Sequence, residues 1–201
     1  YKIAKSLDEK HYLMDVLGAM GNYSLTIAST EKAYKYFLEA KELAVKLENK
    51  KSEIGYLGNM GTILEWEKDF AKADEFFLEV WTYFKDLGDK NSEVRALHHL
   101  VEVNRKLDRD EKVIEYCQRG IEISSEDKMT GLFFYKKSIF AYYKMNKLEN
   151  AHTATKEAIK IARSLDNKEK ELEFLLSLGE SYMFYNMQSE ALEIYEQALI
   201  L

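Results

Sequence analysis

Few residues in this 201-residue chain have side chains suited to catalysis or metal binding. There are four histidines and one cysteine. His98 and His99, followed by Glu102, form the one cluster worth testing as a metal site. On a helix, His98 and Glu102 would present two ligands on one face. A zinc site needs three or four, and the sequence has no second HxxxH or CxxC pair. We interpret these residues as polar wall residues and expect no metal and no cofactor.

Other features of the sequence also argue against an enzyme. It contains no glycine-rich phosphate loop, nucleophile elbow or catalytic carboxylate pair. A single cysteine, Cys117, rules out a disulfide framework. The net charge of −6 without basic clusters argues against nucleic-acid binding. No apolar run approaches the roughly 18 residues of a membrane helix. We expect a non-enzymatic cytoplasmic region with no nucleic-acid or membrane partner.

The elements that position these side chains are predicted to be helices. The chain has no proline and only nine glycines, which is too little turn chemistry for a sheet-rich fold. It also repeats itself at intervals of about 40 residues. One column of the repeat is Ala33, Ala73, Val113, Ala151 and Ala191. A second, twelve positions upstream, is Gly21, Gly61, Val101, Ile139 and Gly179. A third, four positions downstream of the first, is Phe37, Phe77, Cys117, Thr155 and Tyr195.

Spacing within a repeat indicates two antiparallel helices, A and B. Helix A has one stripe made of Leu17, Met20, Gly21 and Ser24, and helix B has one made of Ala33, Phe37 and Ala40. A glycine within a helix costs about 1 kcal/mol relative to alanine. Glycines at the same phase, such as Gly61 and Gly179, therefore predict close contacts between helices A and B. The aromatic column would fill the space beside them, and Cys117, which falls in that column, is predicted to be buried.

These columns resemble the tetratricopeptide repeat, whose pattern is large, Leu, Gly, Tyr on helix A and Ala, Phe, Ala on helix B. The fifth repeat shows it best, with Leu175, Leu178, Gly179, Tyr182, Ala191, Tyr195 and Ala198. The repeats are longer than the usual unit of this family and lack its proline, as in the long-helix variant. The resemblance implies an all-α fold, a right-handed superhelical α-solenoid of antiparallel helix pairs.

The repeats divide the chain into a single array. We place them at about 8–49, 50–89, 90–126, 127–167 and 168–201. Residues 2–10 read KIAKSLDEK and residues 160–168 read KIARSLDNK, so residues 1–7 are predicted to end a preceding helix B. Because neither end carries a polar capping repeat, we expect a fragment of a longer protein.

The resemblance also implies that the A helices line a concave groove. Its first two repeats offer small residues such as Gly18 and Gly58 as a floor. Asn22 and Asn59 match positions where family members hold the peptide groups of a ligand. The expected ligand-binding residues are Asn22, Asn59, Arg95, His98, His99, Arg105, Lys136, Lys137, Phe140 and Tyr143.

The middle of the chain differs in charge from the rest. Residues 91–147 carry 11 basic and 9 acidic side chains, whereas the remainder carries 18 and 26. A basic cleft in an acidic protein favours an acidic segment or a terminal carboxylate. The basic positions of the family's carboxylate clamp fall on Gly18, His98 and Glu102, so the match to that clamp is incomplete. The alternative is that the basic excess is a solvated helix face.

Together these features predict a peptide- or protein-binding module. We expect it to be the regulatory or scaffolding region of a signalling or transcription-control protein, with its ligand in the concave groove. The alternative is a structural module that self-associates or stacks on a neighbouring domain through its open repeat ends.

Overall fold

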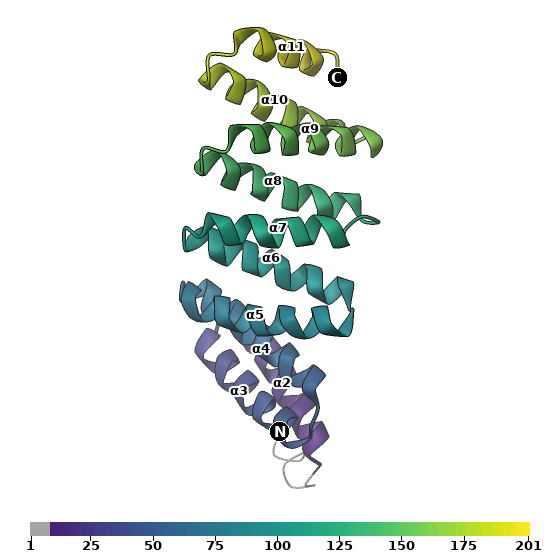
Figure 1. Ribbon diagram of the computed structural model, residues 1–201. Coiled ribbons are helices and arrows are strands. Elements are labelled where there is room, and N and C mark those ends of the chain that lie inside the picture. Colours follow the sequence, from purple (N-terminus) through teal and green to yellow (C-terminus); the bar gives the residue numbers. More distant parts are fainter. Residues whose placement is uncertain (1–8) are drawn as a thin grey trace. The chain divides into compact units, whose positions relative to one another are not determined.

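The computed structural model describes residues 9–201, which form helices joined by short turns with no strand among them (Figure 1). The helices are α2 (Lys10–Thr26), α3 (Thr30–Lys46), α4 (Lys50–Trp66), α5 (Phe70–Leu87), α6 (Lys90–Lys106), α7 (Asp110–Ile123), α8 (Lys128–Lys144), α9 (Leu148–Ser164), α10 (Lys168–Phe184) and α11 (Gln188–Leu199). The predicted all-α class is confirmed. The expectation for residues 1–7 lies outside the described residues.

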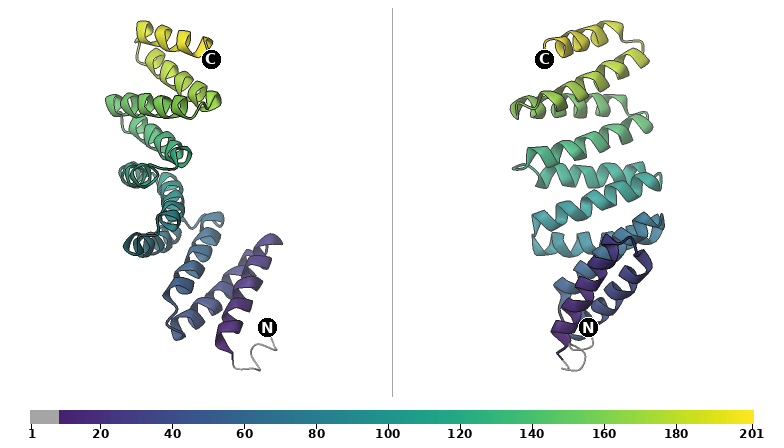
Figure 2. Two further views of the ribbon diagram at one scale, coloured as in Figure 1. Left: turned by 90° about the vertical axis from the view of Figure 1, so that its right-hand side faces the viewer. Right: turned by 180° about the vertical axis from the view of Figure 1, so that it is seen from behind.

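The chain divides into two compact units, Tyr1–Asp108 and Arg109–Leu201. In the first unit each helix from α2 to α6 packs against the next, and in the second each helix from α7 to α11 does the same. Two further views show consecutive helices of each unit lying side by side (Figure 2). Because the turns are short, neighbouring helices run in opposite directions.

The turns between helices follow one conformation at regular intervals. A residue with positive φ ends most helices; these residues are Ala28, Glu48, Lys68, Gly88, Asp108, Asn146, Asp166 and Asn186. The next amide bonds back into the helix, as Ser29 N does to the Ser24 carbonyl at 2.8 Å. This is the Schellman pattern, which satisfies carbonyls left open at a helix end. Several following helices begin with an Asn or Asp side chain that accepts an amide hydrogen bond, such as Asp69 from Lys72 N.

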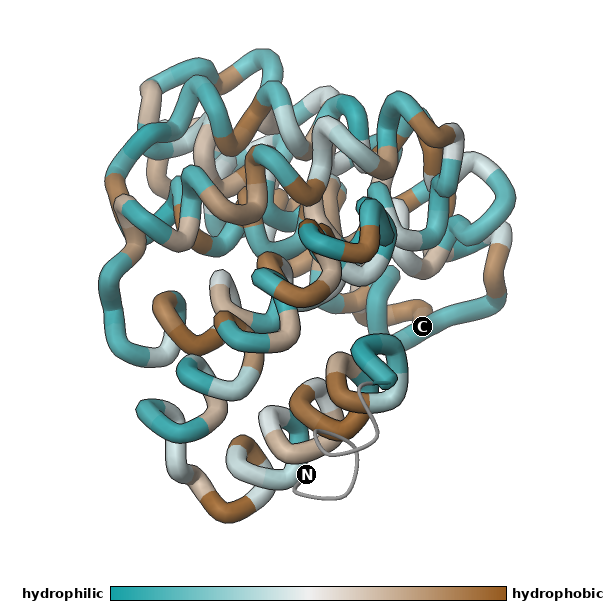
Figure 3. The backbone as a smooth tube through the Cα atoms, turned by 90° about the horizontal axis from the view of Figure 1, so that it is seen from below, coloured by the Kyte–Doolittle hydropathy of each residue, from teal (hydrophilic) through white to brown (hydrophobic). Residues whose placement is uncertain are grey.

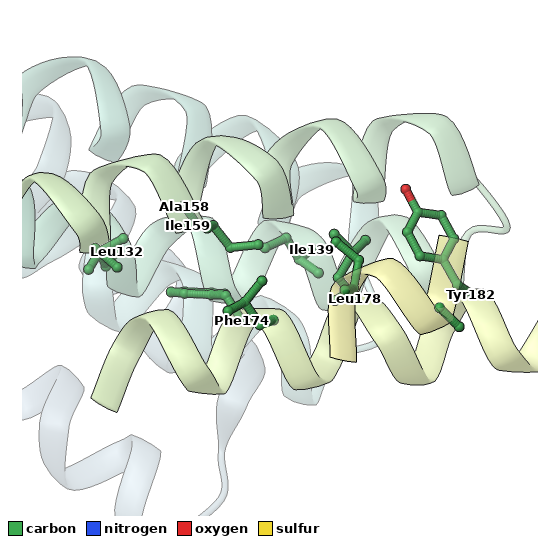
Figure 4. Close-up of a cluster of buried hydrophobic side chains, with 11 residues drawn as sticks. Leu132, Ile139, Ala158, Ile159, Phe174, Leu178 and Tyr182 are labelled. Carbon is green, nitrogen blue, oxygen red and sulfur yellow. The ribbon is translucent and has the colours of Figure 1, made fainter. Parts of the chain in front are cut away.

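Each helix buries apolar residues on one face, and hydrophilic and hydrophobic positions are mixed along the tube (Figure 3). In the second unit, helices α8 to α11 share a core whose members include Ile139, Ala158, Leu178 and Tyr182 (Figure 4). In the first unit, Phe37 and Phe77 are almost fully buried. Cys117 is fully buried, as its column predicted.

The predicted packing glycines are confirmed. A Cβ built on Gly21 would lie 2.5 Å from the Phe37 ring, and one on Gly179 would lie 2.5 Å from the Tyr195 ring. At Gly61 the corresponding distance to Phe77 is 3.0 Å. Carbon atoms in contact normally lie about 3.5–4.0 Å apart. The missing side chain at these positions therefore allows helix B to approach helix A.

Candidate functional site

Helices α4, α5 and α6 enclose a pocket of about 410 Å³, which we call the α4–α6 pocket. Its lining residues are Ser52, Ile54, Gly55, Tyr56, Gly58, Asn59, Thr62, Phe77, Val80, Phe84, Ser92, Arg95, Ala96 and His99. Of the predicted ligand-binding residues, the structure brings Asn59, Arg95 and His99 together here. Ile54, Val80, Phe84 and Ala96 belong to one buried apolar cluster and form its floor. The pocket thus combines an apolar floor with a few polar groups, as ligand sites commonly do.

Asn59 and Thr62 occupy the α4 wall of the pocket. The Thr62 hydroxyl donates to the Gly58 carbonyl at 3.2 Å and so belongs to its own helix. Asn59 is half-buried, and its amide makes no hydrogen bond to any other described residue. An amide carries both donors and an acceptor. Asn59 can therefore pair with a peptide group of a ligand in either direction.

Arg95 lies at the α6 wall, where it is oriented by a short relay. Its Nη2 donates to the Ser92 hydroxyl at 3.1 Å, and that hydroxyl donates to Asp89 Oδ2 at 2.8 Å. Asp89 caps the start of α6, and the hydrogen bonds from the Ser92 amide and hydroxyl lower the pKa of its carboxyl group. No described carboxylate forms an ion pair with Arg95. Asp89 interacts with the guanidinium electrostatically, and the guanidinium donors that Ser92 does not use can meet an acceptor on a ligand.

His99 also lines the pocket, and one of its ring nitrogens already bonds to the protein. Its Nδ1 lies 2.9 Å from Glu65 Oε2, and because a carboxylate only accepts, the ring nitrogen donates. The imidazole also stacks on Phe77, with ring centroids 4.3 Å apart and planes 9° apart. This stack holds the imidazole against a ring that is almost fully buried. His99 therefore shapes the site and gives the Glu65 carboxylate a hydrogen-bond donor.

The other predicted residues of the first unit lie away from the lining of this pocket. Asn22 is exposed on α2, and His98 is half-buried on α6. Arg105 donates to Glu102 Oε2 from both Nε, at 3.1 Å, and Nη2, at 3.0 Å. Its charge is therefore compensated within its own helix. Asn22, His98 and Arg105 remain predicted contacts.

Four predicted residues belong to α8 in the second unit. Lys136 forms an ion pair with Glu173 at 2.5 Å, and Lys137 lies 5.2 Å from the Phe133 ring centroid. Phe140 is 54% exposed. Tyr143 is half-buried beside His152, and burial raises the pKa of its phenol. Lys136 and Lys137 are thus partly occupied by neighbours, whereas Phe140 offers an open apolar surface.

Sequence reasoning missed what helix α5 contributes to the pocket. Phe77 was expected only as a core residue of helix B, yet it lines the space between α4 and α6 together with Val80 and Phe84 of the same helix. Gly18, expected as part of a groove floor, is instead covered: a Cβ there would lie 2.8 Å from the Tyr56 ring. The signal that could have located the pocket is Ala96, because it is small where Tyr56 stands one repeat earlier.

The described residues contain no group of three or more His, Cys, Asp or Glu side chains that could hold a metal ion. None of the helices in the same part of the chain is long and apolar enough to cross a membrane.

Comparisons with known proteins define the class of fold. No family model and no curated protein sequence matches the chain. Among solved structures, a putative kinesin light chain from Podosopora anserina with nearly identical TPR-like repeats is 13% identical, covers 93% of both chains and has a TM-score of 0.72. A signal transduction ATPase from Pyrococcus horikoshii with a tetratricopeptide repeat sensor is 17% identical, and the match covers 87% of this chain and 28% of that chain, with a TM-score of 0.72. YrrB, a TPR protein with an unusual peptide-binding site, is 14% identical, and the match covers 98% of this chain and 90% of that chain, with a TM-score of 0.66.

The chain therefore has the fold of the TPR-like helical repeat proteins, as its columns predicted.

Proposed function

We propose that this chain is a non-enzymatic protein-interaction module that binds an extended peptide segment in the α4–α6 pocket. The observation that carries the proposal is that Asn59 and Arg95 line one pocket above an apolar floor. The Asn59 amide makes no hydrogen bond to another described residue, and the Arg95 guanidinium, which donates to the Ser92 hydroxyl, forms no ion pair with a described carboxylate. The amide can form hydrogen bonds with the backbone of the segment, and the guanidinium favours an acidic side chain or a terminal carboxylate. The peptide-binding site named for YrrB supports a peptide ligand for this fold.

The setting we propose is the regulatory or scaffolding region of a cytoplasmic signalling or transcription-control protein. Support comes from the signal transduction ATPase that carries its repeats as a sensor. In that arrangement the repeats supply recognition, and a separate domain would carry the output.

Selection of peptides tests this function directly. A phage library of random dodecapeptides is panned against the immobilised protein, and the enriched peptides are measured on two variants. Gly55→Leu places a large side chain in the pocket, where a Cβ on Gly55 meets no atom within 4 Å. Gly55→Ala is the matched control, because it changes the same helix position but leaves most of the space open. We expect binding to survive in Gly55→Ala and to be lost in Gly55→Leu. Equal binding to both variants would place the contact surface elsewhere.

Binding kinetics separate the roles of the polar residues. Asn59→Ala should raise the dissociation rate, since it removes short-range pairing with a peptide group. Reversal of the charge at the pocket rim by Arg95→Glu should mainly slow association, because steering acts on the encounter. The long-range electrostatic attraction between the peptide and the protein should weaken with salt, because the Debye length shrinks from about 10 Å at 0.1 M to about 3 Å at 1 M. Unchanged kinetics in both variants would contradict the proposed residue roles.

A second candidate function is self-association. On α11, Leu192 is 61% exposed and Leu199 is 85% exposed, which leaves an apolar surface in contact with solvent. Sedimentation across a range of protein concentrations distinguishes the two functions. A stacking module grows in mass as concentration rises, whereas a peptide-binding module keeps one mass.

A further inference from the structure

The α4–α6 pocket is lined by a member of a repeat column in which three other repeats carry an aromatic residue. The relevant column stands five positions before the glycine column and consists of Val16, Tyr56, Ala96, Phe134 and Phe174. Three of its members are aromatic, and Phe134 and Phe174 are both buried. Ala96 is the smallest member, and it lines the pocket.

Tyr56 shows what the ring does one repeat earlier, between α2 and α4. A Cβ on Gly18 would lie 2.8 Å from Tyr56 Cε1, so the ring rests directly on the α2 backbone. The Tyr56 hydroxyl donates to the Met14 carbonyl at 3.3 Å. Its ring also stacks with Phe37 at a centroid distance of 6.2 Å. The glycine, the ring and the carbonyl therefore form one fitted unit.

The next repeat keeps the glycine but lacks the ring. Gly58 is the equivalent of Gly18 in that repeat, and the nearest atom to a Cβ there is Val80 Cγ2 at 3.7 Å. Ala96, the equivalent of Tyr56, ends at its methyl group. The space that Tyr56 fills beside Gly18 is thus open beside Gly58, and this space is the α4–α6 pocket.

We propose that the peptide ligand fills this space with an aromatic side chain, of tyrosine or phenylalanine size, in the place that Tyr56 occupies one repeat earlier. The proposal rests on the peptide-binding function and specifies its ligand. Ile54, Val80 and Phe84 offer the ring an apolar floor, and aromatic side chains bury a large area on such surfaces. Arg95 at the rim reaches the Asp89 carboxylate only through the Ser92 hydroxyl and forms no direct ion pair with a described carboxylate, so an acidic residue beside the aromatic one complements its charge.

A small probe tests the pocket without any knowledge of the natural ligand. N-acetyl-L-tyrosinamide, N-acetyl-L-phenylalaninamide and N-acetyl-L-alaninamide are titrated into the ¹⁵N-labelled full chain, and amide shifts are followed by NMR. We expect saturable shifts at Gly55, Gly58 and Ala96 with the two aromatic probes and none with the alanine probe. Absence of shifts with the aromatic probes, or equal shifts with all three, would overturn the proposal.

Three substitutions test the pocket from both sides: two fill it, and one opens the equivalent space one repeat earlier. Ala96→Tyr supplies the ring from the chain itself, so the shifts at Gly58 should be lost. If Ala96→Tyr does not fold, as judged by circular dichroism, Gly58→Leu fills the same space from the α4 wall and should likewise abolish the shifts at Gly55 and Ala96. Tyr56→Ala should open the equivalent space between α2 and α4, so that the aromatic probes now also shift the Gly18 amide. Retention of the pocket shifts in the folded, filled variants would refute the assignment.

The composition of selected peptides separates this inference from the function on which it rests. If the enriched peptides share a Tyr or Phe position and do not bind the Gly55→Leu variant, the peptide-binding function and the aromatic ligand are both supported. If they lose binding to Gly55→Leu but show no aromatic preference, the function stands and the aromatic proposal fails. If no peptide is enriched while the aromatic probes bind at Gly58, the peptide-binding function fails and the aromatic pocket stands.

Discussion

Replacement of Gly21 by alanine tests the close contact between α2 and α3. A Cβ at this position would lie between 2.5 and 2.8 Å from three atoms of the Phe37 ring, which is fully buried. Ordinary carbon contacts lie about 3.5–4.0 Å apart, so the ring or the helix must move by about 1 Å. A rigid, fully packed neighbour has little room to do so. Gly58 is the matched control, because its Cβ would meet only Val80, at an ordinary 3.7 Å.

The expected magnitudes follow from two opposing effects. An alanine in place of glycine favours a helix by about 1 kcal/mol. Overpacking of a core costs about 1–3 kcal/mol, and an overlap of this size belongs at the upper end. Gly21→Ala should therefore lower the free energy of unfolding by about 2 kcal/mol, whereas Gly58→Ala should raise it by up to about 1 kcal/mol. Larger replacements, Gly61→Leu and Gly179→Leu, should cost on the order of 1–3 kcal/mol.

Urea unfolding followed by far-ultraviolet circular dichroism measures these changes, with thermal midpoints as a second readout. For a chain of this size, a change of about 2 kcal/mol corresponds to about 4–8 °C in Tm. If Gly21→Ala were as stable as the parent, Phe37 would have to repack at no cost. The helix-packing register, and with it the assignment of the pocket walls, would then be wrong.

Three further outcomes are expected. Asn104 donates to Asp74 at 2.6 Å in a buried contact between α6 and α5, so Asn104→Ala should cost about 1–3 kcal/mol in urea unfolding. Lys136 and Lys170 lower the pKa of Glu173, so its ionised form stabilises the fold above its unfolded pKa of about 4.3, and this stabilisation is lost as pH falls through the lowered folded value. Glu173→Gln should therefore be less stable than the parent near neutral pH, and the difference in urea midpoint should shrink on acidification. Helix α7 is shorter than α5 and has no side-chain N-cap, whereas α5 is capped by an aspartate, so α7 should lose amide protection earlier in hydrogen exchange.

The sequence predicted the helix pairs and their contact glycines because both depend on spacing along one chain. Gly21 and Phe37 recur in fixed columns of the repeat, and each column indicates the side-chain size that its position in the repeat accepts. Gly120 shows where this reasoning stops. In the sequence it stands where earlier repeats have Ala40 and Val80, which suggests only a small residue, yet a Cβ there would lie 2.6 Å from the Phe134 ring on the next helix. The need for glycine arises from a partner in another column.

The candidate site was predictable only in part for the same reason. The family resemblance placed Asn59, Arg95 and His99 on one face, and the structure puts all three around one pocket. It could not show that Tyr56 covers Gly18, because a side chain's reach across to another helix is not encoded in its spacing. Charge counting likewise treated Arg95 and Arg105 alike, although Arg105 has a carboxylate at 3.0 Å and Arg95 forms no ion pair with a described carboxylate.

The regular turns have a consequence for how such a chain can be cut and recombined. Residues 28, 48, 68, 88 and 108 all have positive φ and stand at equal intervals along the chain, as do residues 146, 166 and 186. Every helix in these stretches therefore starts and stops at the same backbone conformation, whether it is an A or a B helix. Duplication or exchange of the block between Lys68 and Asp108 would rejoin equivalent peptide units and keep each helix in phase. Gene duplication and chimera design can thus change the number of repeats without a new type of junction.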